Sequence, residues 1–406
     1  MSHRVRNDCR LCGAIPLETV LELAPTPPAN EFLPADFTGE QEKFPLYLAQ
    51  CKACGHVQLP VVVDPERLFR NYVYVSGTSP AFVAHFERYA QACIAEHGLS
   101  PGDLVVEVGS NDGTLLRFFQ QAGMRVMGVD PAEAISAKAT EDGIDTLPLF
   151  FGRKVAREIH ADTGPAALVV ANNVFAHADD LAEIALGVRD LLDPARGRFV
   201  FEVQYVVDLV EKTLFDMVYH EHLSYHHLAP LIPFFDSMAM SLVDAEHVDT
   251  HGGSIRCTVA PRKNRPQSDR LAAMLKVEAA ALASDAFGKL RRQIDDAGKK
   301  VREFFASETD RSVVGYGAPA KLTTLCHEFG FGNEIHYFVD DSPWKQCLMT
   351  PGTNIPVFAP SRMSEVPPDA VMIFAWNFAP QIAAKLRASG YTGRIVTPLP
   401  VFKEFP

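Results

Sequence analysis

The densest group of proton-transferring side chains lies between residues 219 and 227. This segment, Tyr-His-Glu-His-Leu-Ser-Tyr-His-His, holds four histidines, two tyrosines and one glutamate. Histidine exchanges protons near neutral pH and often serves as a general acid or base. Surface helices rarely carry so many titratable rings. We therefore predict that this segment transfers a proton during a reaction.

Two other interpretations of the histidine segment remain open. A metal centre would need ligands on one side of an element, yet His220 and His222 would lie on different sides of the helix expected here. The segment also lacks a His-Glu-x-x-His motif, which places two metal ligands on one helix face. A purely structural cluster of rings is the second alternative.

A glycine turn at residues 109–113 predicts a ligand site. Residues 104–108 are apolar apart from Glu107 and predict a buried strand, and a helix begins after the turn at Thr114. This order is typical of the first strand, loop and helix of a doubly wound α/β domain. Such domains bind ligands beyond the carboxyl ends of their strands.

Acidic residues near this turn favour a cationic ligand that carries a ribose. Glu107 suits a cationic or amino-acid-bearing ligand better than a pyrophosphate, and Asp130, after the strand 125–129, could accept both ribose hydroxyls. Together they predict a site for S-adenosylmethionine (SAM). The predicted cofactor-binding residues are Glu107, Gly109, Asn111, Asp112, Asp130, Asn172 and Asn173, of which the two asparagines end a later strand.

A second glycine turn matches the dinucleotide fingerprint more closely. Its glycines, Gly315 and Gly317, are followed by Ala320 in a G-x-G-x-x-A spacing, and Asp340 and Asp341 end the next expected strand. A helix beginning after this turn would offer backbone N–H groups to a pyrophosphate. The pattern does not distinguish a pyrophosphate of NAD from that of a nucleotide sugar.

Four of the eight cysteines form two C-x-x-C pairs. Cys9 and Cys12 make the first pair, Cys51 and Cys54 the second, and a glycine follows each pair directly. Four thiolates in this arrangement are typical of a closed, tetrahedral and therefore structural zinc site. Two unrelated cytosolic pairs, or a redox pair, are the alternatives.

Composition restricts the class of partner. The 406 residues suffice for two to three domains, each with its own core. A net charge of −12 argues against nucleic-acid binding, which needs a basic face. The first residues lack the apolar core of a signal peptide, and no run of about 18 apolar residues occurs. We expect a cytoplasmic monomer without membrane contact.

Three regions would position these residues in an α/β fold. Residues 1–70 are expected to form a zinc-binding module, and residues 71–265 a doubly wound, Rossmann-like SAM domain. Residues 266–406 would hold linking helices and a second Rossmann-like α/β domain. The stretch 267–308 is predicted to be helical throughout, since it contains no proline. Loops at 72–81 and 249–256 could close over the site.

The motifs occur in an order that identifies a family. They are the two cysteine pairs, Tyr72-x-Tyr74-x-Ser76, Glu107-x-Gly109-Ser-Asn-Asp-Gly113, Tyr219-His-Glu-His222, Thr250-His-Gly-Gly-Ser254 and Gly315-Tyr-Gly-Ala-Pro-Ala-Lys321. In these features the chain resembles the SAM-dependent sugar C-methyltransferases, which act at C-3 of nucleotide-linked 4-keto-deoxy sugars in deoxysugar biosynthesis. The chain departs from the pattern at Leu322, where relatives tend to carry glycine.

The resemblance implies roles for particular residues. His222 would be the base that removes the C-3 proton, Tyr219 and Glu221 would assist, and His177 and Tyr74 would line the sugar. The other substrate contacts that it implies are Tyr72, Ser76, His220, His251, Gly252, Gly315, Gly317 and Lys321. The substrate would be a sugar linked to dTDP, CDP or GDP.

Methyl transfer to carbon explains why the chain would need these groups. A carbon beside a ketone must lose a proton to a base, and the developing enolate oxygen needs donors. Three rivals remain: an NAD(P)-dependent sugar-nucleotide oxidoreductase that uses the Gly315 turn, an O-methyltransferase on the same substrate class, and a zinc-ribbon scaffold without catalysis.

Overall fold

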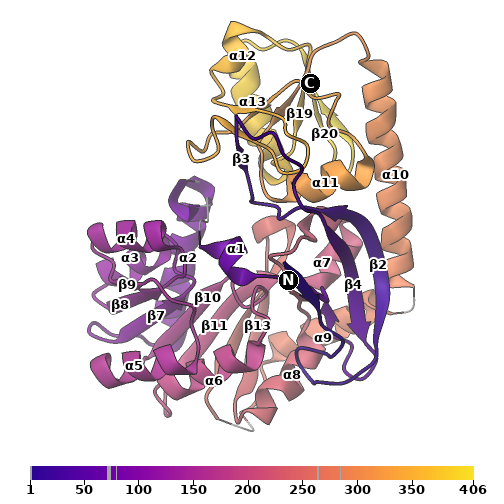
Figure 1. The fold of residues 1–406 in the computed structure, drawn as a ribbon. Helices are drawn as coiled ribbons and strands as arrows, with labels where there is room; N and C mark the ends of the chain where they lie inside the picture. Colours follow the sequence, from indigo (N-terminus) through magenta and orange to yellow (C-terminus); the bar gives the residue numbers. More distant parts are fainter. Residues whose placement is uncertain (1, 71–74, 79, 263–264, 284) are drawn as a thin grey trace.

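Two doubly wound sheets, one in the middle of the chain and one near its end, dominate the fold (Figure 1). The computed structural model describes residues 1–406 except 1, 71–74, 79, 263–264 and 284. The predicted α/β class, with an N-terminal zinc-binding module and two Rossmann-like domains, is confirmed. In the part of the chain that is described, no helix is both long enough and apolar enough to cross a membrane.

The central sheet has seven strands in the order β13-β14-β11-β10-β7-β8-β9. Their bounds are β7 Leu104–Val108, β8 Arg125–Val129, β9 Thr146–Leu147, β10 Leu168–Asn172, β11 Arg198–Gln204, β13 Ser241–Val248 and β14 Ser254–Ala260. The five strands β7, β8, β9, β10 and β11 are parallel. Strands β14 and β13 extend the sheet beyond β11 by antiparallel pairing. The chain order reverses between β7 and β10, which makes a switch point where ligands bind in such folds.

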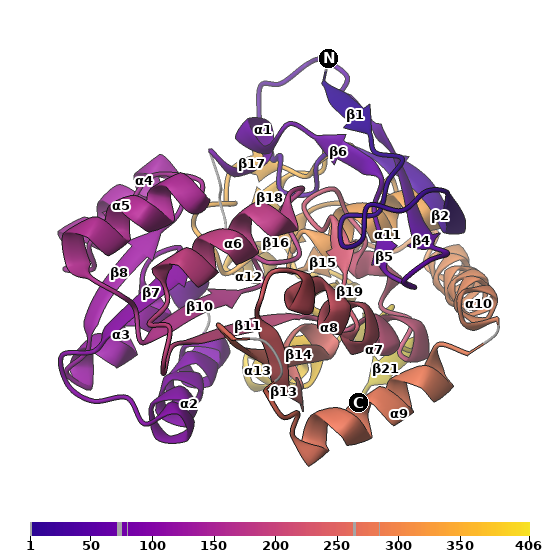
Figure 2. The same cartoon turned by 90° about the horizontal axis from the view of Figure 1, so that it is seen from below.

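Helices cover both faces of the central sheet (Figure 2). They are α2 Pro80–His97, α3 Thr114–Gln121, α4 Glu133–Glu141, α5 Arg153–Thr163, α6 Leu181–Leu191, α7 Val206–Glu211 and α8 Leu228–Ser237. Apolar side chains of α2 and α3 pack on one face, and those of α5, α6 and α8 on the other. All five residues of β7 are buried, which explains its nearly continuous apolar sequence.

The C-terminal sheet repeats this architecture with the order β18-β16-β15-β19-β20-β21. Its elements are β15 Val313–Tyr316, α11 Lys321–Phe329, β16 Phe338–Val339, β18 Val357–Phe358, α12 Arg362–Glu365, β19 Ala370–Ile373, α13 Ala379–Ala388, β20 Arg394–Thr397 and β21 Lys403–Phe405. In this sheet, β15, β16, β18, β19 and β20 are parallel. A second switch point therefore lies between β15 and β19.

The N-terminal module takes strands from both other parts of the chain. Its elements are β1 His3–Val5, β2 Leu17–Thr26, β3 Leu33–Pro34, β4 Phe44–Cys51, β5 Val57–Gln58, β6 Val61–Val63 and α1 Pro65–Phe69. Strand β12, Ser224–Tyr225, pairs with β5, and β17, Leu348–Met349, pairs with β3. The module thus joins the central and C-terminal parts through backbone hydrogen bonds.

The stretch 267–308, predicted to be helical throughout and to hold linking helices, consists of two helices. The stretch forms α9, Asp269–Ala281, and α10, Ala286–Ser307, and Asp285 before α10 adopts a left-handed conformation. The two helices serve different cores: Leu271 of α9 packs with the central sheet, whereas Leu290 and Ile294 of α10 pack with the N-terminal and C-terminal parts. The predicted domain boundaries at 70 and 265 stay predictions.

Candidate functional site

A cavity of about 480 Å³ lies where the two switch points meet. Residues that follow β7, β8, β10 and β11 line it on the central side, and residues that follow β15 and β19 line it on the C-terminal side. The N-terminal module contributes Asn30, Val62 and Phe69. One cavity therefore touches all three parts of the chain, as a site for two ligands would require.

The first glycine turn forms one wall of this cavity. Gly109 lines the cavity at a φ of +70°, and a Cβ atom there would overlap the side chain of Val174. The turn is held by Gly109 N–H, which donates to the Val129 carbonyl at 2.7 Å. Only a residue without a side chain lets the backbone approach a ligand this closely.

Buried polar groups gather beside the turn. The Asn172 amide donates to Glu107 at 3.5 Å, and Asn172 and Asn173 both line the cavity. The second carboxyl oxygen of Glu107 and the side-chain oxygens of both asparagines have no hydrogen-bond partner among the described residues. Burial raises the pKa of Glu107 well above its usual value. Unpaired buried oxygens are costly, so this wall fits a cationic ligand that donates hydrogen bonds.

The two other predicted acids shape the loop itself. Asp130 lines the cavity and accepts the N–H groups of Asn111 and Ala132, each at 2.9 Å. Asp112 is absent from the described cavity lining and instead accepts the N–H of Gly77 at 2.9 Å. Asp130 therefore remains a candidate for the ribose, whereas the contacts of Asp112 are with the protein.

The residues around 77 form a short cover on this loop. The 3-10 helix η1, Ser76–Thr78, donates Ser76 N–H to the Asn111 side chain at 2.9 Å, and Ser76 also lines the cavity. Tyr72 and Tyr74, predicted to contact the substrate, lie outside the described residues. Their roles stay predictions.

The histidine segment is not the expected helix. After the 3-10 helix η2, Phe215–Met217, residues 219–222 form a turn and β12 follows. The cause is non-local, because β12 pairs with β5 of the N-terminal module and its backbone groups are already used in that sheet. The segment consequently runs between the cavity and the N-terminal sheet.

His222 has one ring nitrogen fixed by the backbone. Its Nδ1 lies 2.7 Å from the Met217 carbonyl oxygen, which can only accept a hydrogen bond. Nδ1 therefore carries the proton in the neutral ring, and Nε2 keeps its lone pair. The Gln204 amide lies 3.4 Å from Nε2, and both residues line the cavity. This arrangement fits a general base.

Three further rings flank His222. His177 stacks on it with ring centroids 5.1 Å apart, and Tyr219 lies against it at 4.0 Å. Phe69 in turn stacks on His177, with ring centroids 5.6 Å apart. All four rings line the cavity, so the structure brings together the predicted residues His177, Tyr219 and His222.

Two other residues of the segment point elsewhere. His220 is fully buried, its Nε2 lies 3.1 Å from the Pro45 carbonyl oxygen, and burial lowers its pKa to about 4. The Asn30 amide donates to both carboxylate oxygens of Glu221, at 2.8 and 2.9 Å. Neither residue is among the described cavity lining. The contacts seen for His220 are those of a packing residue, and Glu221 reaches the cavity through Asn30.

The loop at 249–256 does not close over the described cavity. Its 3-10 helix η3, Thr250–Gly252, contains His251, whose side chain is not described. The Gly252 carbonyl accepts from Lys212 at 2.9 Å, and a Cβ at Gly252 would meet Trp376 at 2.6 Å. Gly252 thus packs beside the C-terminal part, and its role in substrate binding stays a prediction.

The second glycine turn places a lysine, rather than its glycines, at the cavity. A side chain at Gly315 would overlap Phe338, and a Cβ at Gly317 would lie 2.8 Å from Ala375, so both glycines permit close packing. The loop continues to Lys321, which begins α11 and lines the cavity, while Leu322 packs in the hydrophobic core.

The ammonium of Lys321 is buried among polar and aromatic partners. It lies 3.5 Å from the Trp376 ring centroid and donates to the Asn377 side chain. Asp216 accepts from the Trp376 indole at 2.6 Å and attracts the ammonium. Burial nevertheless lowers the pKa of Lys321 to about 8, because desolvation disfavours the charged form.

Comparison with known proteins assigns the family. Three family models match successive parts: a putative zinc binding domain at residues 9–69, a methyltransferase domain at 83–236 and a C-methyltransferase C-terminal domain at 249–400. The C-methyltransferase NovU of Streptomyces niveus is 35% identical over 97% of this chain and 96% of its own length. The chain belongs to the SAM-dependent C-methyltransferases.

Likeness to solved structures is weaker. The magnesium protoporphyrin IX methyltransferase of Synechocystis PCC 6803 with bound SAM is 17% identical, with a TM-score of 0.33 over 44% of this chain and 80% of its own. The PH0226 protein of Pyrococcus horikoshii OT3 is 15% identical, with a TM-score of 0.37 over 49% and 98%. Both scores are too low to place a ligand in this chain by analogy.

The C-methyltransferase uses SAM and contains a structural zinc site. The sulfur atoms of Cys9, Cys12, Cys51 and Cys54 all lie within 4.8 Å of one another. Two of the distances, Cys9 to Cys54 and Cys12 to Cys51, are 3.6 Å. Tetrahedral zinc with Zn–S bonds of about 2.3 Å separates its sulfurs by about 3.8 Å, so the four thiols fit the ion. The oxidoreductase and O-methyltransferase alternatives are not favoured.

Three cavity residues of the C-methyltransferase were missed from the sequence. Gln204 ends β11 and could have been found by the strand-end rule that selected Asn172. Asn377 follows β19 at the second switch point and carried the same signal. Lys345 lines the cavity from an irregular loop, and no sequence pattern marked it.

Proposed function

We propose that the protein methylates C-3 of a nucleotide-diphosphate-linked 4-keto-deoxy sugar through an enolate. His222 carries this proposal, because a neutral imidazole with Nδ1–H held by the Met217 carbonyl presents an unprotonated Nε2 in the shared cavity. A base is needed for transfer to carbon and would be dispensable for many acidic oxygen nucleophiles.

The diphosphate is assigned to the C-terminal wall of the cavity. Lys321 and Lys345 line this wall, and the first turn of α11 begins beside them. The Lys345 ammonium donates to the Ala318 carbonyl at 2.9 Å, which keeps it at the turn. Two ammonium groups beside a helix N-terminus suit a diphosphate, despite the net charge of −12.

The residues would divide the chemistry as follows. SAM supplies an electrophilic methyl group on a sulfonium. His222 Nε2 removes the proton from C-3, so that the C–H electrons enter the enolate. The enolate carbon C-3 would then bond to the methyl carbon as the methyl–sulfur bond breaks, and the electron pair of that bond would stay on sulfur. Tyr219, in contact with His222, is the hydroxyl that we assign to the developing oxygen charge. Glu221 would assist from outside the described cavity lining, by holding the Asn30 amide. His177 and Phe69 exclude water from one side of the base.

Proton exchange at C-3 tests the base separately from methyl transfer. The purified protein with S-adenosylhomocysteine is incubated in deuterated water with dTDP-, CDP- and GDP-linked 4-keto-6-deoxy sugars, and deuterium uptake is followed by mass spectrometry. The wild-type protein is expected to exchange one proton of its substrate. His222→Ala should lose exchange by at least about 100-fold, the lower range for general base catalysis.

A matched variant controls for damage to the segment. His226→Gln changes another buried histidine, whose Nε2 lies 3.3 Å from the Phe175 carbonyl oxygen, and glutamine can still donate there. It should retain exchange and methyl transfer. Full activity in His222→Ala would remove His222 from the role of base, and methylation without C-3 exchange in the wild type would contradict an enolate.

A further inference from the structure

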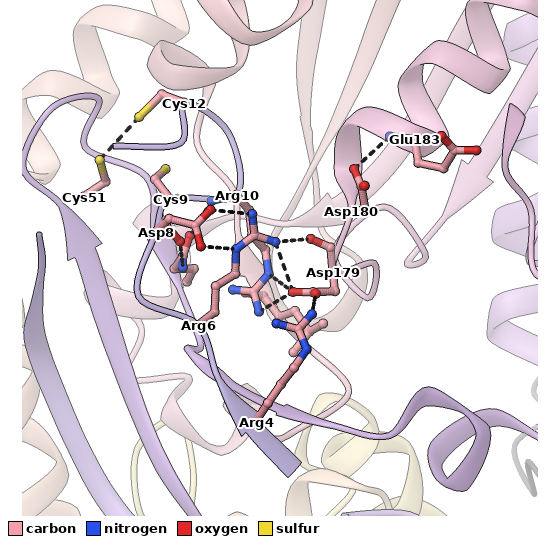
Figure 3. A network of polar contacts seen from close by, with 12 residues as sticks. Arg4, Arg6, Asp8, Cys9, Arg10, Cys12, Cys51, Asp179, Asp180 and Glu183 are labelled. Atoms are coloured by element: carbon pink, nitrogen blue, oxygen red, sulfur yellow. Dashed lines mark hydrogen bonds and ion pairs between the residues drawn. The ribbon is translucent and has the colours of Figure 1, made fainter. Parts of the chain in front are cut away.

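Three arginines of the N-terminal module converge on one carboxylate beside the cavity (Figure 3). Arg4, Arg6 and Arg10 all contact Asp179, which lines the cavity two residues after His177. Arg6 also donates to the Asp179 carbonyl at 2.7 Å. This many cations on one acid tie the loop after β10 firmly to the module.

Arg10 differs from the other two arginines in its burial and its reach. Its side chain is 0% exposed, whereas that of Arg4 is 59% exposed. The Arg10 guanidinium donates to Asp179 at 3.1 Å, to the Leu59 carbonyl at 2.9 Å and to the Leu223 carbonyl at 3.2 Å. A guanidinium spreads its five N–H donors over three nitrogens in a rigid plane, whereas a lysine ammonium carries its three donors on one nitrogen.

The segments that Arg10 joins are those of the stacked histidines. Leu223 directly follows His222, and its N–H donates to the Ala176 carbonyl at 2.9 Å, just before His177. The Ser224 N–H donates to the same carbonyl at 3.0 Å. Arg10 therefore contacts the Leu223 carbonyl, directly after His222, and the Asp179 carboxylate, two residues after His177. The rings of His177 and His222 stack with their centroids 5.1 Å apart.

The zinc knuckle fixes the backbone that carries Arg10. Arg10 lies between Cys9 and Cys12, and Cys9 N–H donates to the Ala14 carbonyl at 3.0 Å in the same tight loop. The Arg10 N–H donates to the Gln58 side chain at 2.9 Å. An ion bound by both cysteines would hold this loop in one conformation, and with it the direction of the guanidinium.

We propose that Arg10 is a positioning residue, through which the zinc knuckle sets the relative placement of His177 and His222. The structural site then acts on the reaction at a distance, by way of Asp179 and the Leu223 carbonyl. The reading of His222 as the base rests on the proposed function. The placement of the two rings does not, and it can be measured by itself.

The test uses the full-length, zinc-loaded protein with S-adenosylhomocysteine. Histidine is labelled with ¹⁵N, and the His222 ring signals are assigned by their loss in His222→Gln. Arg10→Lys keeps the charge but replaces the guanidinium nitrogens that contact the three acceptors with a single nitrogen. We expect its His222 ring signals to move, its zinc content to stay at the wild-type level, and C-3 deuterium exchange to fall about tenfold, since small misplacements of a catalytic group are costly.

Arg4→Lys is the matched control. It makes the same substitution in an arginine that contacts the same carboxylate, but its exposed ion pair contributes little. Its His222 signals and exchange rate should equal those of the wild type. If Arg10→Lys retains zinc and also shows unchanged His222 signals, or matches Arg4→Lys in every readout, the proposal is overturned.

A second variant protects the test against misfolding. Asp179→Asn removes the carboxylate from the other end, on a side chain that is 22% exposed. It should shift the same His222 signals, and the double variant with Arg10→Lys should lose no more exchange than Arg10→Lys alone. Additive losses, or unmoved signals in a folded Asp179→Asn, would overturn the coupling. Exchange that survives in His222→Ala would instead refute the proposed function and leave the ring-placement result standing.

Discussion

The two glycine turns occupy equivalent places in two similar sheets, yet their walls of the cavity differ in charge. Beside the Gly109 turn lie the buried acid Glu107 and asparagine oxygens without partners. Beside the Gly315 turn lie the ammonium groups of Lys321 and Lys345. One wall thus favours a cationic ligand and the other an anionic one, although both arise from the same strand-turn-helix architecture.

The comparison shows that strand-end chemistry, rather than glycine spacing, separates the two sites. The Gly315 turn matches the dinucleotide pattern better, but its glycines pack against Phe338 and Ala375. Asp340, at the position where an acid could take a ribose, accepts the Ala318 N–H within its own loop at 2.7 Å. This contrast can be tested by substitution and by pH, beginning with the change of largest expected effect.

Loss of zinc should disturb both turns, because the N-terminal module pairs with strands of both other parts. Cys51→Ser removes one of four thiolates, and structural zinc sites contribute several kcal/mol or more to folding. We expect loss of bound zinc and a large fall in melting temperature. Cys347→Ser, at an exposed cysteine, is the control. An unchanged melting curve in zinc-free Cys51→Ser would contradict a structural ion.

Gly109→Ala and Gly317→Ala should separate the walls. Both glycines have positive φ, +70° and +82°, so both substitutions strain the backbone. The methyl group at 109 would in addition meet Val174 at the cavity. We expect S-adenosylhomocysteine affinity to fall about 100-fold in Gly109→Ala, corresponding to about 2.7 kcal/mol, and to change little in Gly317→Ala. Calorimetric titration checks this, and equal losses would erase the contrast.

Lys321→Met should weaken the anionic ligand alone. Charge-assisted hydrogen bonds contribute about 1.5–3 kcal/mol, so the affinity for the nucleoside diphosphate that binds best should fall about 10- to 100-fold. The affinity for S-adenosylhomocysteine should be unchanged. The matched control is Lys385→Met, because Lys385 lies on α13 and pairs with Asp341. A loss of S-adenosylhomocysteine binding in Lys321→Met would count against two separate walls.

The two walls should respond to pH in opposite directions. Burial lowers the pKa of Lys321 to about 8, so its ammonium loses a proton as the pH rises through about 8 and diphosphate affinity falls. Burial raises the pKa of Glu107, so its carboxyl ionises as the pH rises and affinity for cationic SAM increases. Between pH 7 and 9 we expect calorimetry to show about a tenfold fall in diphosphate affinity and no fall in SAM affinity. Parallel slopes for the two ligands would contradict the charge contrast.

Much of the fold followed from local patterns. The strand at 104–108 and the helix at Thr114 were predicted because a buried strand, a glycine turn and a helix start are each encoded by neighbouring residues. The grouping of Gly109, Asp130 and Asn172 at one cavity was also predicted, since carboxyl ends of parallel strands share one edge.

Predictions failed where pairing is non-local. The segment around His222 was expected to be helical, but β12 takes its hydrogen bonds from β5, more than 160 residues earlier in the chain. The sequence predicted helical structure over 267–308, but it did not mark where α9 ends and α10 begins, and these two helices pack in different cores. Lys345 was missed because it lies in an irregular loop. Local propensity carries no information on such partners.

The sequence by itself determined the chemical inventory: four thiols for zinc, two glycine turns, and a histidine-rich segment between them. Only the folded structure decided which nitrogen of His222 carries the proton in the neutral ring, because folding brings the Met217 carbonyl within 2.7 Å of Nδ1. Only the tertiary structure placed Arg10 of the zinc knuckle on Asp179. Residue type sets what a side chain can do, whereas its protonation and partners depend on the groups that folding brings within hydrogen-bond distance.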